Sequence, residues 1–190
     1  MLKSRLLFAD FIMERYNPSI ELIDGEVHRD FLRETYYYAW KNSIDPSTKT
    51  GALIVNANLN EIISYGVNHF PPGINPTEEQ IKDKQWKKEN IIHAETSAIF
   101  AAAANGGKPT RGAVMYMPWV PCTPCANAII DAGIKILIGH KEMIIKTPER
   151  WWNSLNYALN LFEKSGVKTF MYSGKIEGVK SLVDDLEWYP

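Results

Sequence analysis

The sequence predicts an α/β fold in which helices cover both faces of a β-sheet. In the second half of the chain, short apolar runs suited to buried strands alternate with longer segments of helical character. The expected strands are residues 113–117, 135–139 and 167–172, and the expected helices are residues 93–104, 121–132 and 148–165. Strands that alternate with helices form βαβ units, whose helices pack on the sheet that the strands build.

The first half of the chain adds a hairpin and further helices. The apolar runs 51–55 and 61–67 flank a turn at 58–60, which predicts two antiparallel strands beside the three later ones. Amphipathic spacing predicts helices over 2–16 and 30–42, and a last helix is expected over 178–186. Residues 68–79 are expected to form a Pro- and Gly-rich loop, and residues 80–90 a polar surface segment.

Length and composition indicate one globular domain. The chain has 190 residues, of which 45% are hydrophobic and 23% charged. We expect a single domain over 1–190, with a helical extension over 1–28, a core over 29–172 and a C-terminal extension over 173–190. No segment approaches the roughly 20 apolar residues of a membrane span, and the first residues lack the apolar run of a signal peptide. We therefore expect a cytoplasmic protein with no membrane partner.

The charge balance favours a small substrate over a nucleic acid polymer. The 21 basic and 22 acidic residues give a net charge of -1. Proteins that hold a long polyanion usually carry a basic excess. We therefore expect a small-molecule partner and no nucleic acid polymer.

Metal-binding side chains stand at the starts of two predicted helices. His93 and Glu95 open one helix in the order His-Ala-Glu, and Cys122 and Cys125 open the other in the order Pro-Cys-Thr-Pro-Cys. A segment H-x-E followed by P-C-x-x-C is the signature of zinc deaminases. The pattern predicts one zinc ion per chain on His93, Cys122 and Cys125, with Glu95 as the catalytic group.

The residue types suit a catalytic zinc site. Three protein ligands leave the fourth tetrahedral position to water. Two cysteines three residues apart on a first helical turn face the same point, and helix N-termini favour thiolate and bound hydroxide. Zinc lowers the pKa of its bound water toward about 7. Glu95 can take the proton of this water and pass it to a ring nitrogen and to the leaving ammonia.

Two other interpretations of the motif stay open. A Cys-x-x-Cys pair with Pro124 between the thiols is also common in redox proteins, although these have no need of the His-Ala-Glu segment. A structural zinc site would need a fourth ligand. The remaining histidines are His28, His69 and His140, and only His69 lies in a loop that is expected to reach the site.

Several motifs in order resemble the deoxycytidylate (dCMP) deaminase family of the cytidine deaminase-like superfamily, over about residues 30–172. Residues 43–52 are similar to the family's S-x-D-P-x-T-x-V-G-A, 66–73 to G-Y-N-G-x-P-x-G, 93–99 to H-A-E-x-N-A-I, and 116–134 to Y-V-T-x-x-P-C-x-x-C-A-x-x-I-I-x-A-G-I. The resemblance implies a three-layer α-β-α sandwich of the cytidine deaminase type with a mixed five-stranded sheet. It also implies a homo-oligomer, for which the aromatic-rich helix 30–42 and the C-terminal Leu-Glu-Trp-Tyr-Pro offer apolar surface.

The resemblance also implies contacts to the substrate. Asn68 matches a loop Asn that touches the sugar, and the backbone N–H of Ala94 is expected to bond the base carbonyl. Trp119 lies where polynucleotide cytidine deaminases carry a Trp at the pocket, and His69 is a candidate for the sugar or phosphate. Each side chain has a structural alternative: an Asn in a turn often bonds its own backbone, the Trp can be a core residue, and the His can lie on the surface.

The expected function is deamination of a free cytosine nucleotide, with dCMP to dUMP favoured and with Lys49 and Arg111 as basic candidates near the phosphate. The chain differs from the family pattern beside the expected pocket, with Val67 for Tyr, His69 for Gly, Ser97 for Asn and Pro118 for Thr. These differences leave a modified cytosine, guanine or a related ring as alternative substrates.

Two further classes of function stay in view. A tRNA adenosine deaminase would need a strongly basic surface, which the composition does not indicate. An inactive deaminase-fold module that binds nucleotides or partners is the alternative outside the enzymes. The presence of Glu95 argues against it, because a copy without chemistry would be free to lose this residue.

Overall fold

A six-stranded mixed sheet forms the centre of the protein, whose computed structural model describes residues 20–190. In spatial order the strands are β1 (Glu21–Ile23), β6 (Lys168–Tyr172), β5 (Ile136–His140), β4 (Val114–Tyr116), β2 (Gly51–Val55) and β3 (Ile62–Val67). The first four pair in parallel, and β2 is antiparallel to both β4 and β3. All five predicted strands are therefore confirmed.

The sixth strand, β1, corrects the predicted strand count. It lies in the segment that was expected to be a helical extension, and it pairs with β6 in the register Glu21↔Phe170. Three residues are too few to show a periodicity of two, so the sequence gives no signal for this strand. The helix expected over 2–16 lies outside the described residues.

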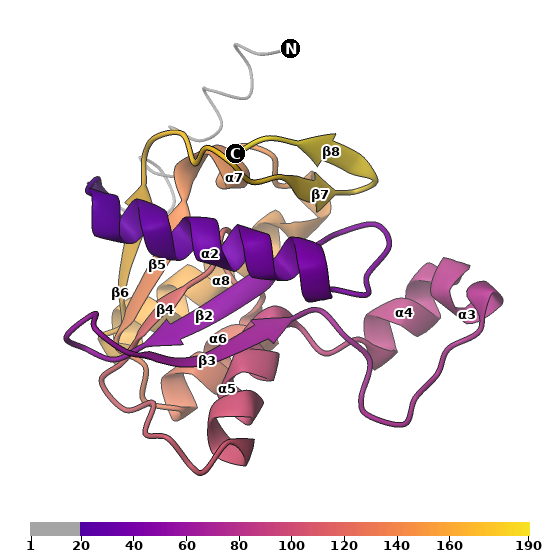
Figure 1. Ribbon diagram of the computed structural model, residues 1–190, viewed down its shortest axis with the longest axis horizontal. Helices are drawn as coiled ribbons and strands as arrows, with labels where there is room; N and C mark the ends of the chain where they lie inside the picture. Colours follow the sequence, from indigo (N-terminus) through magenta and orange to yellow (C-terminus); the bar gives the residue numbers. More distant parts are fainter. Residues whose placement is uncertain (1–19) are drawn as a thin grey trace.

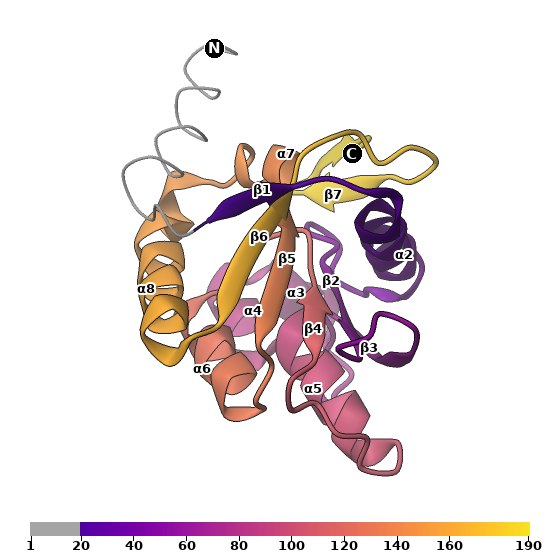
Figure 2. The same ribbon diagram turned by 90° about the vertical axis from the view of Figure 1, so that its left-hand side faces the viewer.

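Helices cover the two faces of the sheet in a three-layer sandwich, as predicted (Figures 1 and 2). One face carries α2 (Glu26–Asn42). The opposite face carries α5 (Ala94–Ala104), α6 (Thr123–Asp131) and α8 (Glu149–Ser165). The short helix α7 (Lys141–Ile144) joins β5 to α8. The helix α2 begins four residues before the expected start, because the chain enters it through Gly25, whose φ is 106°.

The central strands β2, β4 and β5 are buried on both faces, which explains their continuous apolar runs. Successive side chains of a strand point to opposite faces. In β2, Ala52 and Ile54 pack on the side of α5, α6 and α8, whereas Leu53 and Val55 pack on the side of α2. The two cores thus share each strand between them.

Gly66 in β3 sets how closely α5 lies on the sheet. A Cβ atom at this position would lie 2.1 Å from the carbonyl oxygen of Ala94 and 2.3 Å from the amide nitrogen of Ala98. Real Cβ atoms do not approach backbone so closely. The absence of a side chain in β3 therefore allows α5 its position, and with it the start of α5 at His93.

The C-terminal segment is a β-hairpin, so the helix predicted over 178–186 is wrong. The strands β7 (Ser181–Val183) and β8 (Leu186–Trp188) pair around Asp184 and Asp185, whose φ angles are 48° and 66°. Asp is one of the few residues that enter the left-handed region readily, and a two-residue turn of this kind suits a hairpin. The hairpin packs on the loop before β2, with hydrogen bonds from Lys49 N to Leu182 O and from Asp185 N to Ser47 O.

Two short helices fill the segment between β3 and α5. The helices α3 (Glu78–Lys82) and α4 (Lys84–Asn90) project from the body of the molecule (Figure 1). Neither helix has a buried residue, so neither shows the apolar periodicity that predicts helices. Their start signals are polar: Thr77 forms a capping box with Gln80, and Asp83 caps α4. Within residues 20–190 no helix has the length and apolar character needed to cross a membrane.

Candidate functional site

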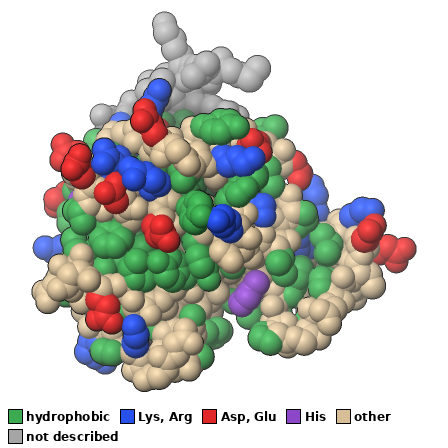
Figure 3. Space-filling model, viewed as in Figure 1, with side chains coloured by type: hydrophobic (Ala, Val, Ile, Leu, Met, Phe, Trp, Pro, Cys, Tyr) green, Lys and Arg blue, Asp and Glu red, His purple; other side chains and the backbone are tan. Residues whose placement is uncertain are grey.

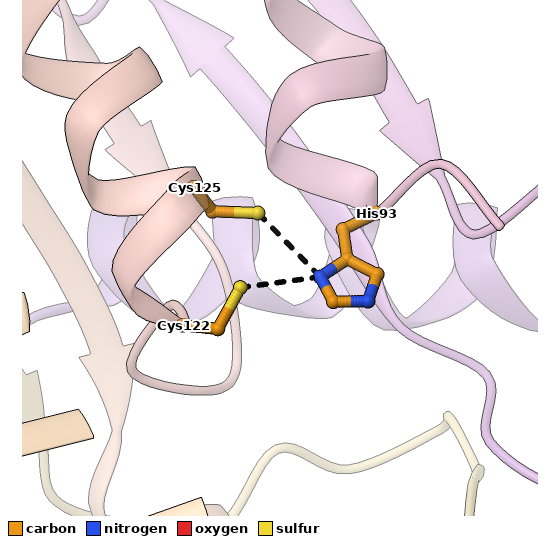
Figure 4. A group of neighbouring side chains, drawn as sticks. All are labelled: His93, Cys122 and Cys125. Atoms are coloured by element: carbon orange, nitrogen blue, oxygen red, sulfur yellow. Dashed lines mark hydrogen bonds between the residues drawn. The ribbon is translucent and has the colours of Figure 1, made fainter. Parts of the chain in front are cut away.

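The starts of α5 and α6 bring His93, Cys122 and Cys125 together, as the sequence predicts. His93 is the N-cap residue of α5, Cys122 is the N-cap residue of α6, and Cys125 lies in the first turn of α6. Figure 4 shows the His93 ring turned toward both sulfur atoms. The Nδ1 atom lies 3.4 Å from Sγ of Cys122 and 3.5 Å from Sγ of Cys125.

This donor set fits a zinc ion. The three ligand atoms all lie within 4.8 Å of one another. Zinc binds an imidazole nitrogen at about 2.0–2.1 Å and a thiolate at about 2.3 Å, so two such ligands on a tetrahedral ion are about 3.5 Å apart. The distances between Nδ1 and the two sulfur atoms have this value. One nitrogen and two sulfur donors leave the fourth position of the tetrahedron open.

The electrostatics of the three groups place negative charge on sulfur. Hydrogen bonds with Cys125 and with His93 lower the pKa of the Cys122 thiol to about 4, although burial opposes this change. The hydrogen bond with Cys122 raises the pKa of His93 to about 9, although burial opposes it. The bond with Cys122 and burial raise the pKa of the Cys125 thiol. Because zinc binds thiolates and neutral imidazole, metal uptake here must release protons from Cys125 and His93.

Glu95 provides a buried carboxyl group beside the three ligands. It is the second residue of α5 and only 4% exposed. Burial raises the pKa of Glu95, and the nearby charge of His93 opposes this rise. A carboxyl group whose pKa moves up toward neutrality is suited to take and return a proton.

The structure places Asn68 and Ala94 in direct contact. Asn68 follows β3 and is 7% exposed, and its Oδ1 accepts a hydrogen bond of 3.1 Å from the backbone N–H of Ala94. The side chain of Asn68 therefore reaches across to the start of α5 and does not close a local turn. The N–H of Ala94, expected to bond a base carbonyl, is occupied by Asn68. Among residues 20–190, the Nδ2 donor of Asn68 has no hydrogen-bond partner.

His69 is held next to the segment that leads into the site. Its backbone forms a β-bridge with Ile92, with bonds of 3.1 Å from His69 N to Ile92 O and 2.8 Å from Ile92 N to His69 O. The Nδ1 atom is buried and has no hydrogen-bond partner within residues 20–190. Burial lowers the pKa of His69. The site loop 68–69 and the start of α5 are thus connected through backbone and side-chain bonds.

Trp119 is fixed by Thr147, a residue that the sequence did not suggest. Trp119 is half-buried and packs against the core below α5, α6 and α8. Its Nε1 donates a hydrogen bond of 2.7 Å to Oγ1 of Thr147, whose carbonyl oxygen accepts from Nε1 of Trp152 at 3.2 Å. The indole N–H is thus engaged within the protein, and only the ring is left to contact a ligand.

Hydroxyl groups that the sequence did not suggest lie next to the cysteines. Oγ1 of Thr96 lies 3.6 Å from Sγ of Cys125. Ser154 on α8 bonds to Thr123, the residue that follows Cys122. Thr96 lies three residues after His93 in the same helical turn, so its spacing was a usable signal. No spacing rule connects Ser154 to Thr123, which lies 31 residues away in the sequence.

The two basic candidates for the phosphate differ in position. Nζ of Lys49 donates to the carbonyl oxygen of Ser43 at 2.7 Å, and Oγ of Ser43 donates to the carbonyl oxygen of Asn68 at 3.2 Å. Lys49 therefore lies near the site loop. Arg111 precedes β4 and packs by Gly133, beyond the C-terminal end of α6. The nine residues of α6, each rising about 1.5 Å, separate Arg111 from the cysteines, so the structure does not bring Arg111 to the metal ligands.

Comparison with known proteins finds one matching family. The sequence model of the cytidine and deoxycytidylate deaminase zinc-binding region matches residues 26–140. The deoxycytidylate deaminase of Enterobacteria phage T4 is 37% identical over 106 residues, which cover 55% of this chain and 52% of that protein. The deoxycytidylate deaminase of Homo sapiens is 32% identical over 114 residues, which cover 57% of this chain and 62% of that protein. The chain thus spans about half to three fifths of the length of these relatives.

A solved structure shares the fold. The dCMP deaminase of the cyanophage S-TIM5, in complex with dCMP and dUMP, superposes with a TM-score of 0.58 at 19% sequence identity. The match covers 78% of this chain and 99% of that chain. At this identity the likeness supports the three-layer arrangement of helices and sheet and says nothing of the substrate.

Proposed function

Because the chain belongs to the family of cytidine and deoxycytidylate deaminases with the zinc-binding region, we propose that it is a zinc-dependent deaminase. It would hydrolyse a free cytosine nucleotide, with dCMP as the preferred substrate. The observation that carries the proposal is the buried Glu95 in the same helical turn as His93, whose Nδ1 faces two thiols at 3.4 and 3.5 Å. This arrangement combines a metal donor set that has an open position with a protected proton carrier.

In the proposed reaction, water adds to the ring carbon that bears the amino group, the carbon–nitrogen bond breaks, and dCMP and water become dUMP and ammonia. His93, Cys122 and Cys125 would hold the zinc ion, which supplies a bound water of lowered pKa. Glu95 would take a proton from the attacking water and deliver protons to the ring nitrogen and to the leaving amino group. The raised pKa of Glu95 supports this role, because the carboxyl must accept a proton and give it back.

Asn68 would both build and contact the substrate pocket. Its Oδ1 holds the N–H of Ala94, and its Nδ2 remains available to an oxygen atom of the sugar or the base. His69 lies next to it, and its depressed pKa favours a neutral imidazole at physiological pH. The buried Nδ1 has no partner among the described residues, so a proton there would be costly. The ring therefore offers an Nε2–H donor to a sugar or phosphate oxygen. The ring of Trp119 would form part of the pocket wall.

Two observations support a free nucleotide as the substrate. The relatives in phage T4 and Homo sapiens bear the name deoxycytidylate deaminase. On the face of the molecule in Figure 3, Lys and Arg side chains alternate with Asp and Glu and form no continuous basic stripe. A polymer substrate would favour such a stripe.

A substrate panel tests the proposal. The zinc-loaded protein is assayed for ammonia release from dCMP, deoxycytidine, dCTP, a 5-substituted dCMP and guanine. We expect the highest kcat/KM for dCMP. If deoxycytidine or guanine exceeds dCMP by about tenfold or more, the pocket is built around another substrate and the monophosphate assignment fails.

The Glu95→Gln variant tests the proton carrier. The variant keeps the size of the side chain and the three metal ligands, so it should retain its zinc content and fold. Its turnover should fall by about 10²–10⁴-fold or more, since one group serves several proton transfers. Glu163→Gln, at an exposed position of α8, is the matched control and should leave turnover unchanged. A Glu95→Gln enzyme with near wild-type turnover would show that another group carries the protons.

We also propose that the protein assembles into a homo-oligomer. Tyr37 on α2 is 47% exposed, and Leu186 and Tyr189 near the C-terminus are each 72% exposed. Tyr37 and Tyr189 line the same hollow of the surface, and contiguous apolar patches are typical of surfaces that pair with another subunit. Light scattering at micromolar concentration tests the assembly, and a mass corresponding to a single chain contradicts it.

A further inference from the structure

The helix that carries both cysteines has no oxygen-bearing N-cap side chain at its start. The first backbone N–H groups of a helix have no partner within the helix, and an N-cap side chain normally accepts one of them. The N-cap residue of α6 is Cys122, and its side chain makes no capping bond. Its sulfur is turned to His93 instead, as Figure 4 shows.

Ser154 on α8 supplies an oxygen acceptor from outside the helix for the first N–H of α6. Its Oγ accepts a hydrogen bond of 3.0 Å from the backbone N–H of Thr123, the first residue of α6. Oγ1 of Thr123 donates to the carbonyl oxygen of Ser154 at 3.1 Å, and the two hydroxyl oxygens also lie 3.1 Å apart. Both residues are partly buried. The bonds form a closed set in which each hydroxyl can donate once and accept once.

The position of Thr123 gives this contact its importance. Thr123 lies between Cys122 and Cys125, and the two sulfur atoms face one point only while residues 122–125 keep the shape of a helical start. Cys122 itself is extended, with φ and ψ of -70° and 165°. Its carbonyl oxygen accepts the first helical bond, from Ala126 N at 2.9 Å, and this holds one side of the peptide between Cys122 and Thr123. The N–H of the same peptide, that of Thr123, points away from α6 and is held from α8 by Ser154.

We propose that Ser154 is a positioning residue of the metal site, which acts through Thr123 to hold Cys122 and Cys125 in their geometry toward His93. The inference rests on the proposed zinc site but not on the substrate. Partners that orient metal ligands typically change metal affinity by about 10–100-fold when they are removed. A contact that only joins α6 to α8 would lower the stability of the whole protein and leave the metal affinity unchanged.

The test compares metal binding in the wild-type chain and its variants. Zinc affinity is measured by competition with a chromophoric chelator, and the ligand geometry by the visible absorption of the cobalt(II) form. Ser154→Ala should weaken zinc binding about tenfold or more and shift the cobalt(II) bands. Ser154→Thr restores a hydroxyl at this position and should recover most of the affinity.

Ser165→Ala is the matched control on the same helix. Its hydroxyl also bonds to a backbone carbonyl, that of Phe162 at 3.1 Å, but at the far end of α8. Zinc affinity in this variant should stay within about twofold of the wild type, because the substitution touches no group of the site. If Ser154→Ala retains wild-type zinc affinity and cobalt(II) bands, the contact only packs α6 against α8 and the proposal fails.

A second variant covers the case in which Ser154→Ala does not fold. Thr123→Val keeps the volume of the side chain and the backbone N–H bond to Ser154, but it removes the two hydroxyl contacts. It should weaken zinc binding less than Ser154→Ala, and an unchanged affinity contradicts the proposal. A failure of dCMP turnover with normal zinc binding concerns the proposed substrate only, so the two outcomes are separable.

Discussion

At the scale of single residues, the amide of Asn68 is a structural part of the site as well as a candidate substrate contact. Its oxygen satisfies the N–H of Ala94, which is fully buried at the start of α5. The variant Asn68→Ala leaves this donor without a partner, which should lower the free energy of unfolding by about 1–3 kcal/mol.

Urea unfolding of the metal-free protein measures this loss without interference from zinc. Asn153→Ala on the exposed face of α8 is the matched control and should change the stability by no more than about 0.5 kcal/mol. If the two variants unfold alike, another group takes over the bond to Ala94, and Asn68 is needed only for the substrate.

The surroundings of Glu142 predict how the free energy of unfolding changes at acid pH. Its Oε2 lies 2.9 Å from Nε2 of the fully buried His140, which also bonds Tyr36 through Nδ1 and the carbonyl oxygen of Gly174 through Nε2. Burial alone would raise the pKa of Glu142, but the hydrogen bond and charge of His140 outweigh it, so the pKa is lowered.

A carboxyl group whose pKa is lower in the folded state stabilises the fold above its unfolded pKa, which is about 4.3 for Glu. This contribution is lost as the pH falls through the lower, folded pKa. The wild type should therefore be more stable than Glu142→Gln at pH 6, and the difference should shrink below about pH 4.3. Chemical unfolding across this range, with Glu163→Gln as the control for loss of a surface carboxylate, measures it. A difference that is independent of pH contradicts the assignment.

The residue scale also shows what sequence can reveal about a site. His93, Glu95, Cys122 and Cys125 were predictable because their spacing within two short segments follows from the chemistry of one ion and the geometry of a helical start. Thr147 and Ser154 were not predictable, because each acts on a residue about 30 positions away through a single hydrogen bond. In the sequence, Ser154 does not stand out from Ser165, the other serine of α8.

At the scale of elements, the contact between β3 and α5 decides where the metal ligands stand. The variant Gly66→Ala would place a methyl group 2.1 Å from the carbonyl oxygen of Ala94. Because the neighbour is backbone, the strand or the helix must move. Overpacking of this kind typically costs about 1–3 kcal/mol. The movement should also weaken zinc binding, since α5 starts with His93 and Glu95.

Gly107→Ala is the control for this prediction. Gly107 has a φ of 68° and no atom within 4 Å of an added Cβ, so the substitution strains the backbone but crowds nothing. It should cost stability, by about 1–2 kcal/mol, without a change in zinc affinity. Thermal unfolding and chelator competition on both variants separate the two effects. Normal zinc binding in Gly66→Ala would mean that the sheet, and not α5, absorbs the movement.

The elements that the sequence missed share a physical cause. The helices α3 and α4 bury no residue, β1 has three residues, and the hairpin β7–β8 depends on two Asp residues in the left-handed region. None of them shows an apolar period over several turns or pleats, which is the main signal of secondary structure. The strands at the centre of the sheet were clear because both of their faces are buried.

At the scale of the whole molecule, the layered architecture follows from one feature of the sequence. Parallel strands need crossover connections, and helices are the usual way to make them, so the alternation in the second half requires helices on the sheet. The same connections return the chain to one edge, where the segment after β4 leads into the cysteine helix α6. The metal site thus arises where the helices α5 and α6, neighbours in one layer, begin at the edge of the sheet.

Zinc should therefore act as a link within the helical layer. Its ligands come from α5 and α6, which are separated by β4 in the sequence and share few covalent constraints. We expect about one zinc per chain by metal analysis. Because the folded protein binds the ion and the unfolded chain binds it less well, free zinc at about 1,000 times its Kd should stabilise the fold by up to about 4 kcal/mol.

Removal of zinc with a chelator should lower the Tm and release the start of α6, and the return of zinc should reverse both changes. The same chelator saturated with zinc is the control, since it acts on the solution but cannot take the ion. Cys125→Ser should lose zinc and unfold at a lower Tm even without a chelator. Cys125 is buried, and a hydroxyl is a poor replacement for its thiolate as a zinc ligand. The zinc site is contradicted if the purified protein holds no zinc and still deaminates, and if its Tm is the same with and without the chelator.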